Sequence, residues 1–473
     1  MKRIIICALI LAATSCRERD PLYCKSSADC KTAERPLCDL TGANPDSEGL
    51  PNTCVGTTGS DGGTSGDAGP MCPATCPTTS PICDPSTKEC RPCAADSECS
   101  SLVCDTATGQ CVAPSEIIYV TATGATSTPC GSAGTPCGLI PLGVQQLGSG
   151  IRTLHIARGT YPDALVLRGV QATVVGEAAV IDPAAVGQPA LEVSDATGLA
   201  TNLLVRGLVL QGAASGAVGE KGSGVHCSKG FFMPIALRLV GVDVADNAER
   251  GVYNENCTLS ITRSTVQRNV MTGVLSVGGE VTIVDSTMRN NAAGVTCIGC
   301  SLIMERNVLS VGTRWALSLQ ESGTLVTPFK IVNNVFHGFA DSATQGVIDI
   351  RGGNYGPTQF EFNTVALSTG KLINCQNSTS SIRTVIRNSI VFGDYDLSGN
   401  ACRAEYILTK TPVAGDGNVI GDPQFVNPGT DFRLQGTSPA RNAANNTEGI
   451  TSDLDGRPRP SGRQADLGAF ELP

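Results

Sequence analysis

Apolar residues recur along this chain in short pairs, and the pairs follow a repeating unit. A Gly-Val pair opens each unit, and successive pairs are 27, 22 and 21 residues apart, at Gly224, Gly251, Gly273 and Gly294. A further step of 22 residues leads to Ala316-Leu317. Each unit also carries two apolar residues separated by one other residue, at Leu237 and Leu239, Leu259 and Ile261, Val281 and Ile283, and Leu302 and Met304. This alternation is the period of a half-buried strand, and two strands per unit with no helical stretch between them predict a parallel β-helix.

We expect the β-helix to span residues 116–420. An alternating strand begins at Glu116, and coils run without a break from Arg152. Between them, residues 139–147 place apolar side chains at helical spacing and predict a short helix. A helix there would cover the open end of the first coil, which otherwise presents unpaired backbone groups and apolar core surface.

Asparagine recurs at one place in three successive units, just past the second predicted strand. Asn247, Asn269 and Asn291 are spaced by 22 residues. In stacked coils these side chains lie above one another, so each amide can bond to the next and satisfy backbone groups at a tight turn. We interpret them as a structural ladder.

The composition agrees with stacked strands and argues against a nucleic-acid partner. Charged residues make up 16% of the chain and aromatic residues 4%, while glycine occurs 54 times, as is typical of strands joined by tight turns. The formal net charge is −9, and no basic cluster with interleaved aromatic residues occurs. Binding to nucleic acid requires such clustered positive charge.

The first residues predict export. A basic start precedes an apolar run from Ile4 to Ala13 that is too short to span a bilayer, and small residues then lead to Cys16. Residues 13–16 resemble the bacterial lipobox, in which the cysteine becomes the lipidated first residue. We therefore predict a lipoprotein signal peptide over residues 1–15 and lipidation of Cys16, with an ordinary signal peptide cut nearby as the alternative. Removing the two basic residues of the signal changes the net charge from −9 to −11.

The cysteines predict structural disulfides in an oxidising compartment. The chain has 22 Cys, and setting aside Cys7 in the signal and Cys16 leaves 20, an even number. Residues 16–112 have almost no apolar periodicity and hold three groups of four, which predict small disulfide-bonded modules with a linker. The groups are Cys24, Cys30, Cys38 and Cys54; Cys72, Cys76, Cys83 and Cys90; and Cys93, Cys99, Cys104 and Cys111. Cys90 and Cys93 also have a zinc-like spacing, but the exported context and the lack of a nearby His favour disulfides.

The remaining cysteines lie in the β-helix region. We expect Cys130 and Cys137 to close a small loop. The other candidates lie on one coil or on neighbouring coils, where a bridge requires Cα atoms within about 7 Å of each other. They are Cys227 and Cys257, Cys297 and Cys300, and Cys375 and Cys402.

The last part of the chain, residues 421–473, has a different pattern, which we interpret as a C-terminal cap. It contains Gly421-Asp422-Pro423-Gln424-Phe425, Asp431-Phe432-Arg433-Leu434, Ser438-Pro439-Ala440, Asp453-Leu454-Asp455-Gly456-Arg457 and Asp466-Leu467-Gly468-Ala469-Phe470-Glu471. With the coils before it, this ending resembles the bacterial choice-of-anchor Q proteins of the pectin-lyase-like right-handed parallel β-helix superfamily. Many relatives have Asp-Ala-Gly after Ser-Pro-Ala, whereas this chain has Asn442-Ala443-Ala444. The resemblance implies an all-β, secreted or surface-attached protein and does not imply an activity.

The same superfamily contains enzymes, and their chemistry sets a test for this chain. Lyases of this shape hold calcium with carboxylates beside an Arg or Lys base, and hydrolases use grouped Asp residues. Both need outward carboxylates on neighbouring coils. By strand alternation the outward carboxylates of this chain occur singly, and the nearest to a catalytic group is Asp349, Arg351 and Glu361 on one coil or its neighbour. A solvated face with an incidental ion pair is the alternative interpretation.

Histidines and tail aspartates give weaker signals. No Ser or Cys nucleophile stands at a telling spacing from any of the three histidines, His155, His226 and His337. An Asp-x-Asp-Gly sequence is a common start of calcium loops, so calcium is considered at Asp453, Asp455 and Asp466, with turn-forming Asp side chains as the alternative.

Two functions of different classes follow. The first is a lipid-anchored, non-catalytic module at the outer membrane or cell surface of a bacterium, which binds polysaccharide or cell-surface components and needs no cofactor. The second is a polysaccharide lyase or glycoside hydrolase that works on the outer face of the β-helix. The scarcity of stacked carboxylates favours the first, and a net charge of −11 would repel uronic-acid polymers unless calcium intervened.

Overall fold

The computed structural model divides the chain into two compact units, Met1–Cys72 and Pro73–Pro473. The structure describes residues 37–39, 53–55, 76–148, 150–183, 187–195, 199–215, 222–230, 233–322, 327–340, 346–351, 357–376, 384–394, 402–445 and 449–473. In the first unit this covers the backbone of two antiparallel strands, β1 (Leu37–Asp39) and β2 (Thr53–Val55), which place Cys38 opposite Cys54. The signal peptide, Cys16, Cys24, Cys30 and Cys72 lie outside the described residues. Within them, no helix has the length and apolar character needed to cross a membrane.

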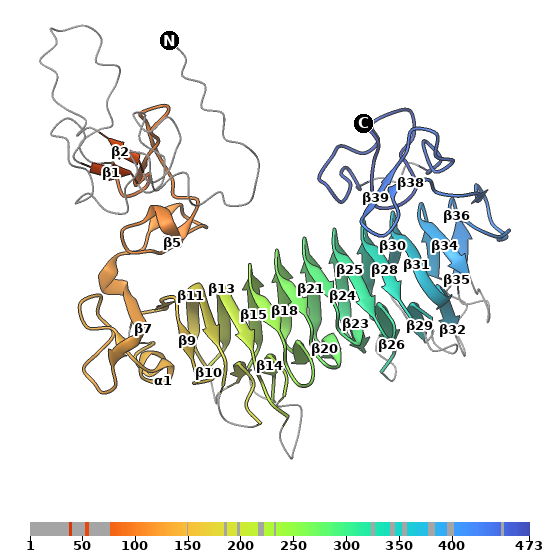
Figure 1. The fold of residues 1–473 in the computed structure, drawn as a ribbon. Coiled ribbons are helices and arrows are strands. Elements are labelled where there is room, and N and C mark those ends of the chain that lie inside the picture. The colour runs from red at the N-terminus through yellow and green to blue at the C-terminus, as the bar shows by residue number, and fades with distance from the viewer. Residues whose placement is uncertain are drawn as a thin grey trace, which may run out of the picture. The chain divides into compact units, whose positions relative to one another are not determined.

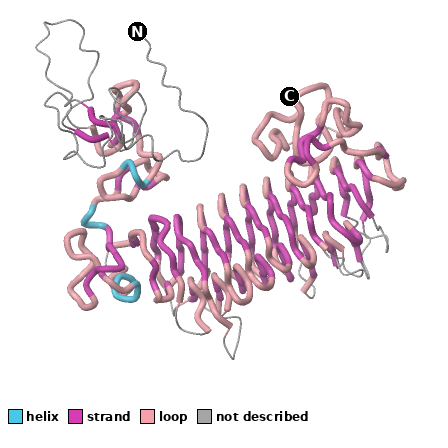
Figure 2. Tube along the Cα trace, in the orientation of Figure 1, coloured by secondary structure: helices cyan, strands magenta, loops and turns pink. Residues whose placement is uncertain are grey.

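The second unit contains a right-handed parallel β-helix, and strands and loops dominate it (Figures 1 and 2). Nine strands from successive coils form a continuous parallel sheet, which we call the first sheet. They are β10 (Leu165–Arg168), β12 (Leu191–Ser194), β14 (Val225–Ser228), β17 (Val252–Glu255), β20 (Thr272–Val277), β23 (Ala293–Ile298), β26 (Leu317–Gln320), β29 (Ile348–Arg351) and β32 (Ile373–Gln376). The repeated Gly-Val pairs stand at or just before these strands, and the Val side chains are buried in the core.

A second face of the coils follows the first sheet. Its strands carry the alternating apolar pairs that the sequence shows, such as Leu259 and Ile261, which are buried. They are β7 (Ile117–Ala125), β8 (Thr153–Ile156), β11 (Gln171–Ile181), β13 (Thr201–Gln211), β15 (Ile235–Val240), β18 (Thr258–Thr262), β21 (Glu280–Val284), β24 (Ser301–Glu305), β27 (Phe329–Val332), β30 (Thr358–Glu361), β33 (Thr384–Arg387) and β35 (Cys402–Glu405).

A third face completes each coil, so the prediction of two strands per unit was one strand short. Its strands are β9 (Thr160–Tyr161), β16 (Asp243–Ala245), β19 (Thr265–Gln267), β22 (Thr287–Arg289), β25 (Val308–Gly312), β28 (Val335–Phe339), β31 (Thr364–Lys371), β34 (Ile390–Asp394), β36 (Leu408–Thr409) and β37 (Val419–Ile420). The later halves of β11 and β13 pair with this face as well. In the regular coils these strands have three residues and one central apolar side chain in the core, at Val244, Val266 and Met288. A single apolar residue shows no alternation, which is why the pattern did not reveal these strands.

Two asparagine ladders line the turns. Asn247 donates to Asn269 over 2.9 Å and Asn269 donates to Asn291 over 3.0 Å, as the spacing predicted, although these residues follow the third-face strands. A second ladder follows the second-face strands, where Asn307 donates to Asn334 over 2.9 Å and Asn334 to Asn363 over 3.1 Å. Both ladders are buried, and their amides also donate to backbone carbonyls of the preceding coil.

The N-terminal end of the coils is covered as the sequence predicted. Helix α1 (Ile140–Val144) is shorter than the predicted 139–147, and its Ile140 belongs to the main core. The loop before it is closed by the disulfide Cys130–Cys137.

The second half of the Cys-rich region belongs to the same unit as the coils. It contains the hairpins β3 (Ile82–Cys83) with β4 (Cys90–Arg91) and β5 (Cys104–Asp105) with β6 (Gln110–Cys111), and the 3-10 turns Asp96–Glu98 and Pro114–Glu116. Arg206 of β13 holds it to the coils by donating to Asp96 over 2.7 Å and to the Cys104 carbonyl over 2.6 Å. The described disulfides here are Cys76–Cys90, Cys93–Cys104 and Cys99–Cys111, and Cys83 is also disulfide-bonded.

The tail, residues 421–473, lies along the side of four successive coils and includes the hairpin β38 (Phe425–Asn427) and β39 (Asp431–Leu434) (Figure 1). Its contacts are with strands of the third face and with the turns beside them. Asn333 donates to the Ser452 carbonyl over 2.7 Å, and the Ala469 N–H donates to Thr364 over 3.0 Å. The tail therefore packs on the side of the coils that the third face forms.

Candidate functional site

The three residues proposed as a catalytic group do not come together. Asp349 and Arg351 lie on β29 of the first sheet, whereas Glu361 lies on β30 of the second face. Asp349 is fully buried and accepts bonds from Ser318 and Asn374, with Arg351 at 2.7 Å. Burial raises the pKa of the Asp349 carboxyl, against the opposing effect of Arg351. The Asp349 carboxylate thus has no exposed surface and is occupied by these three side chains.

Glu361 takes part in a different cluster. It lies 3.6 Å from Arg387, which also binds Glu405 at 2.6 Å. Glu405 is paired with Arg403 as well, and the bond from Arg387 is the main cause that lowers the pKa of Glu405. This is a chain of ion pairs along the second face, in which the carboxylates are already neutralised.

The strands of the first sheet carry three carboxylates in all, and no two of them lie on adjacent coils. Glu192 is on β12, Glu255 on β17 and Asp349 on β29. With about 4.8 Å between coils, Glu192 and Glu255 are separated by two coil steps, or roughly 10 Å, and in addition by two residues along the strand direction. Glu255 and Asp349 are separated by four coil steps, or roughly 19 Å. Paired glycosidase carboxylates stand about 5–9.5 Å apart, so these strands provide no such pair.

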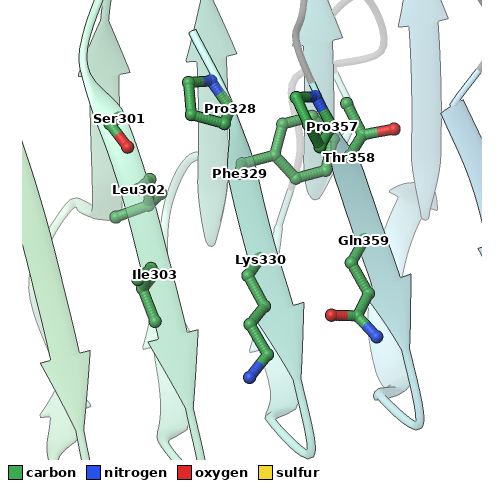
Figure 3. Close-up of a pocket in the computed structure, with 9 residues that line it drawn as sticks. All are labelled: Ser301, Leu302, Ile303, Pro328, Phe329, Lys330, Pro357, Thr358 and Gln359. Carbon is green, nitrogen blue, oxygen red and sulfur yellow. The ribbon is translucent and has the colours of Figure 1, made fainter. Parts of the chain in front are cut away.

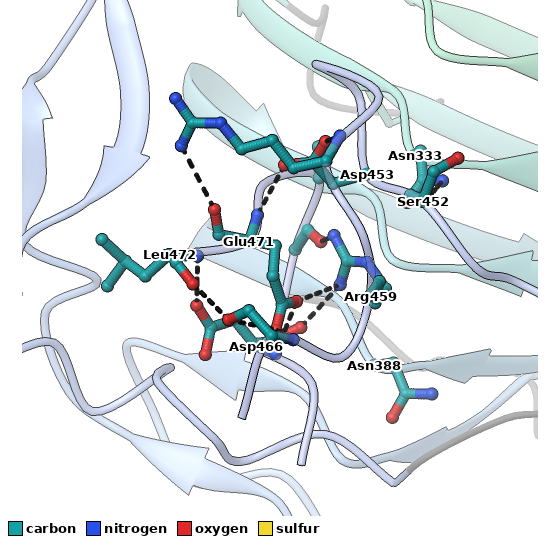
Figure 4. Close-up of polar contacts among 12 residues, drawn as sticks. Asn333, Asn388, Ser452, Asp453, Arg459, Asp466, Glu471 and Leu472 are labelled. Carbon is teal, nitrogen blue, oxygen red and sulfur yellow. Dashed lines mark hydrogen bonds and ion pairs between the residues drawn. The ribbon is translucent and has the colours of Figure 1, made fainter. Parts of the chain in front are cut away.

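The tail aspartates are fully engaged in holding the tail (Figure 4). Asp453 accepts the backbone N–H groups of Arg457 and Glu471 at 2.7 and 2.9 Å. Asp466 accepts those of Asn442 and Leu472 at 2.7 and 2.8 Å. Both carboxylates are buried, and Asp455 instead binds Arg433 at 2.9 Å. These donor-filled oxygens do not fit a calcium site, and the alternative interpretation of turn-forming side chains accounts for them.

The zinc alternative does not fit either. Cys90 and Cys93 belong to separate disulfides, with Cys76 and Cys104. Among the described residues, the group of metal-type ligands that lies close together is Cys93, Cys99 and Cys104, and all three are oxidised.

Each of the three histidines packs against an aromatic ring. His155 lies 3.1 Å from Glu177 and beside Tyr119, and burial is the main cause that lowers its pKa. His337 packs on Phe432 of the tail, and burial lowers its pKa as well. His226 stacks on Tyr253 on the outside of the first sheet, with ring centroids 5.2 Å apart.

The first sheet has an open groove beside it, which we call the Trp315 groove. It has a volume of 310 Å³ and is lined by the starts and outer side chains of β20, β23 and β26 together with the turns that precede them. Its lining residues include Arg250, Met271, Leu275, Thr296, Arg314 and Trp315. Val270 and Met271 on its rim are 66% and 45% exposed, so apolar surface faces the solvent there.

The groove arises from a change of side-chain size within one stacked column. Arg250, Thr272, Ala293 and Trp315 each stand directly before the repeated position occupied by Gly251, Gly273, Gly294 and Ala316. Hydrogen bonds between successive coils hold this column in register, as from the Gly251 N–H to the Thr272 carbonyl. The two middle residues are small and the two end residues are large. The depression between Arg250 and Trp315 therefore spans three coil steps, or roughly 14 Å.

An aromatic ring and a guanidinium form one end of the groove. Trp315 is half-buried, and its indole N–H donates to Thr296 over 2.8 Å, which fixes the ring. The exposed Arg314 guanidinium lies 5.9 Å from the Trp315 ring centre. A fixed indole with an adjacent cation offers a flat apolar surface and a charged hydrogen-bond donor side by side.

The other end carries a second guanidinium and a polar cluster. Arg250 lies over Tyr253 at 5.2 Å and 3.8 Å from Glu249, and burial lowers its pKa. Tyr253 donates to Glu255 over 2.8 Å, and burial together with this bond raises the pKa of Tyr253 to about 12.

Glu255 in that cluster remains ionised. It also accepts a bond from Ser228 at 2.8 Å. Burial acts to raise its pKa, but the bonds from Ser228 and Tyr253 and the nearby His226 outweigh burial and lower it. Because the Ser228 hydroxyl donates to Glu255, Ser228 is not activated by His226 as a nucleophile would be.

A second groove of 320 Å³ lies on the second face (Figure 3). Pro328 and Pro357 form a ridge at the starts of β27 and β30, and Ile303, Lys330 and Gln359 project from three neighbouring strands. Its cation, Lys330, is already paired with Glu305. The Trp315 groove thus has the stronger set of groups for recognising a ligand.

The sequence contains a feature that indicates the Trp315 groove, although the strand pattern alone does not reveal it. Trp315 is the single Trp of the chain, and it follows the small Thr272 and Ala293 in the column one position before the repeated glycines. Alignment of the repeats on that position places Arg250 and Trp315 in one column. The size of the depression between them, however, depends on side-chain packing.

Sequence comparisons find no match for this chain among protein-family models or curated proteins. Comparison with solved structures does give matches. A crystal structure of pectate lyase Pel9A matches with a TM-score of 0.52 and 15% identity, over 76% of this chain and 96% of that chain. GH136 lacto-N-biosidase from Eubacterium ramulus matches with a TM-score of 0.33 and 10% identity, over 65% of this chain and 67% of that one. Pectin methylesterase from Aspergillus niger gives 0.29 and 12%, over 71% and 93%.

At these identities the likeness concerns the fold. The match to pectate lyase Pel9A, together with the parallel sheets, shows that the protein is a right-handed parallel β-helix of the pectin-lyase-like type with a disulfide-rich region at its N-terminal side.

Proposed function

We propose that this protein is an exported, lipid-anchored, non-catalytic module of the choice-of-anchor Q type that binds glycans on the outside of its first sheet. The observation that carries the proposal is the Trp315 groove. A fixed indole, exposed apolar side chains and two guanidinium groups surround an elongated depression. Sugar rings present C–H faces that pack on aromatic surfaces and hydroxyl groups that bond to charged donors.

The carboxylates support binding rather than turnover. The three on the strands of the first sheet are separated by at least two coils, and Asp349 is enclosed. The lipobox-like sequence ending at Cys16, the disulfides and the tail motifs support a surface location.

Tryptophan fluorescence tests the proposal directly, because Trp315 is the single Trp of the chain. The protein is titrated with neutral and acidic oligosaccharides, and binding is expected to shift the emission and to give a saturable curve. The same samples are assayed for new reducing or unsaturated ends, with and without calcium. A saturable shift without new ends supports the proposal, whereas turnover of any polymer would establish the lyase or hydrolase alternative.

The anchor is tested separately. Cys16→Ser is expected to abolish fatty-acid incorporation and membrane retention in the native host. Retention of both by the variant would show that the lipoprotein prediction is wrong.

A further inference from the structure

We infer that the Trp315 groove recognises an anionic glycan directly through its guanidinium groups, without a bridging calcium ion. The inference rests on the proposed function and adds the chemical class of the ligand and the way in which it is held. It reverses the expectation, drawn from the net charge, that acidic polymers would be repelled.

The charge at the groove differs from that of the whole chain. The chain has a formal charge of −9, yet the charged residues that line the groove are Arg250 and Arg314. Among the residues that the structure describes, Arg314 has no carboxylate within ion-pair distance, whereas Arg250 has Glu249 at 3.8 Å. Local charge decides recognition once a ligand is within a Debye length of about 8–10 Å.

The contacts around Arg314 place its guanidinium where it can bind an anion. Its backbone N–H donates to the Ala292 carbonyl over 2.9 Å, which places it at the groove end, and its side chain lies beside the fixed Trp315 ring. A planar guanidinium binds carboxylate and sulfate oxygens with two parallel bonds. A sugar ring packed on Trp315 would bring its acidic substituent within reach of Arg314.

The spacing of the two cations suits a chain that runs along the rod. Arg250 and Trp315 are three coil steps apart, roughly 14 Å, with the small Thr272 and Ala293 between them. An oligosaccharide laid along this column can place one acidic group near each end. The carboxylates nearest to the groove, Glu249 and Glu255, are engaged with Arg250 and with Tyr253 and Ser228, so neither adds to a calcium site with a second carboxylate on a neighbouring coil.

The experiment compares three ligands of equal length: a uronate oligosaccharide, its neutral methyl ester and a sulfated oligosaccharide. Binding to the full protein is measured by Trp315 fluorescence and by titration calorimetry, in EDTA and at low and high salt. We expect at least one anionic ligand to bind about tenfold or more tightly than the ester, a difference of ~1.4 kcal/mol. We expect EDTA to have no effect and salt to weaken binding, and the ligand bound more tightly identifies the acidic group.

Two variants isolate the guanidinium. Arg314→Ala is expected to weaken anionic binding about tenfold and to leave binding of the ester unchanged, with Arg314→Lys in between because it keeps charge without the planar fork. Arg238→Ala is the matched control, since Arg238 is an exposed arginine on β15 of the second face and its removal changes the net charge equally. We expect less than a twofold effect from it.

The outcomes of these experiments distinguish a failure of this inference from a failure of the proposed glycan-binding function. Equal binding of ester and anion, or an equal loss in Arg314→Ala and Arg238→Ala, overturns the inference and leaves glycan binding intact. Loss of anionic binding in EDTA also overturns it, in favour of calcium bridging. No binding of any of the three ligands or of the broader oligosaccharide panel overturns the proposed function itself.

Discussion

On two sides of the β-helix an arginine lies over an aromatic ring, and the two places differ in what surrounds the guanidinium. Arg459 lies 4.1 Å from the Phe362 ring beneath the tail, where it and Glu471 are almost fully buried. It donates to the carbonyls of Asp466 and Gly468 at 2.8 and 3.0 Å. Arg314 lies over Trp315 in the open, without an ion-pair partner among the described residues.

The difference between the two surroundings indicates a structural role for Arg459 and a ligand-binding role for Arg314. On the side covered by the tail, backbone N–H groups bind the tail carboxylates and Glu471 lies beside Arg459. These charged groups are therefore already occupied and are not available to a ligand. On the open side, the aromatic ring is fixed by Thr296, and no carboxylate of the described residues pairs with the cation. An arginine beside an aromatic ring therefore holds the tail in place where it is covered, and it forms a candidate binding surface where it is exposed.

The largest expected effect is on the side covered by the tail. Arg459→Ala leaves the buried Glu471 carboxyl without its cation, which costs about 3–5 kcal/mol for a buried pair. Chemical unfolding, with protease sensitivity of the tail, measures it. Arg441→Ala is the control, because Arg441 is exposed in the same tail and is expected to change stability by less than about 0.5 kcal/mol. Equal unfolding midpoints for the two variants would mean that the contacts of Arg459 do not hold the tail.

A smaller loss is expected in the ladder that lies inside the coils near the groove. Asn269→Ala removes the bonds to Asn247, Asn291 and the Val244 carbonyl, and unsatisfied buried groups cost about 1–3 kcal/mol. The control is Thr282→Ala on the outer side of β21. An unfolding midpoint for Asn269→Ala that matches the control would place the coil register in error.

The third effect is a pH dependence. Burial is the main cause that raises the pKa of Glu471 above its ordinary value of 4.5. The folded protein therefore keeps this proton where the unfolded chain has lost it, so the contribution is fully present below pH 4.5 and disappears as pH rises through the folded pKa. Glutamine does not titrate. The stability of the wild type relative to Glu471→Gln is thus expected to increase as the pH falls, and a flat or opposite trend in paired unfolding curves would contradict it.

The smallest expected effect is on the open side. Arg314→Ala removes an exposed side chain with no described ion pair, so stability is expected to change by less than about 0.5 kcal/mol. Thermal unfolding of the variant beside the wild type measures it. A loss comparable to that of Arg459→Ala would make Arg314 a structural residue and would remove the contrast between the two sides.

The amino-acid pattern by itself determined the architecture. Val252, Val274 and Val295 recur at the coil period, and burying one side of each strand leaves a single register for stacked coils. The Asn247 ladder followed from the same period, and the short helix at the start followed from apolar residues at helical spacing. These features depend on local alternation and on a repeat that the chain displays directly.

The tertiary structure decided everything that depends on which face a residue occupies. Asp349 and Glu361 are close in sequence, but they lie on different faces of the coil, Asp349 in β29 and Glu361 in β30. Asp453 and Asp466 have the composition of a calcium loop, but the folded tail fills their oxygens with backbone donors. The Trp315 groove exists because two small side chains stack between two large ones. These side chains are about one coil apart in sequence, and only the packing of the coils brings them together.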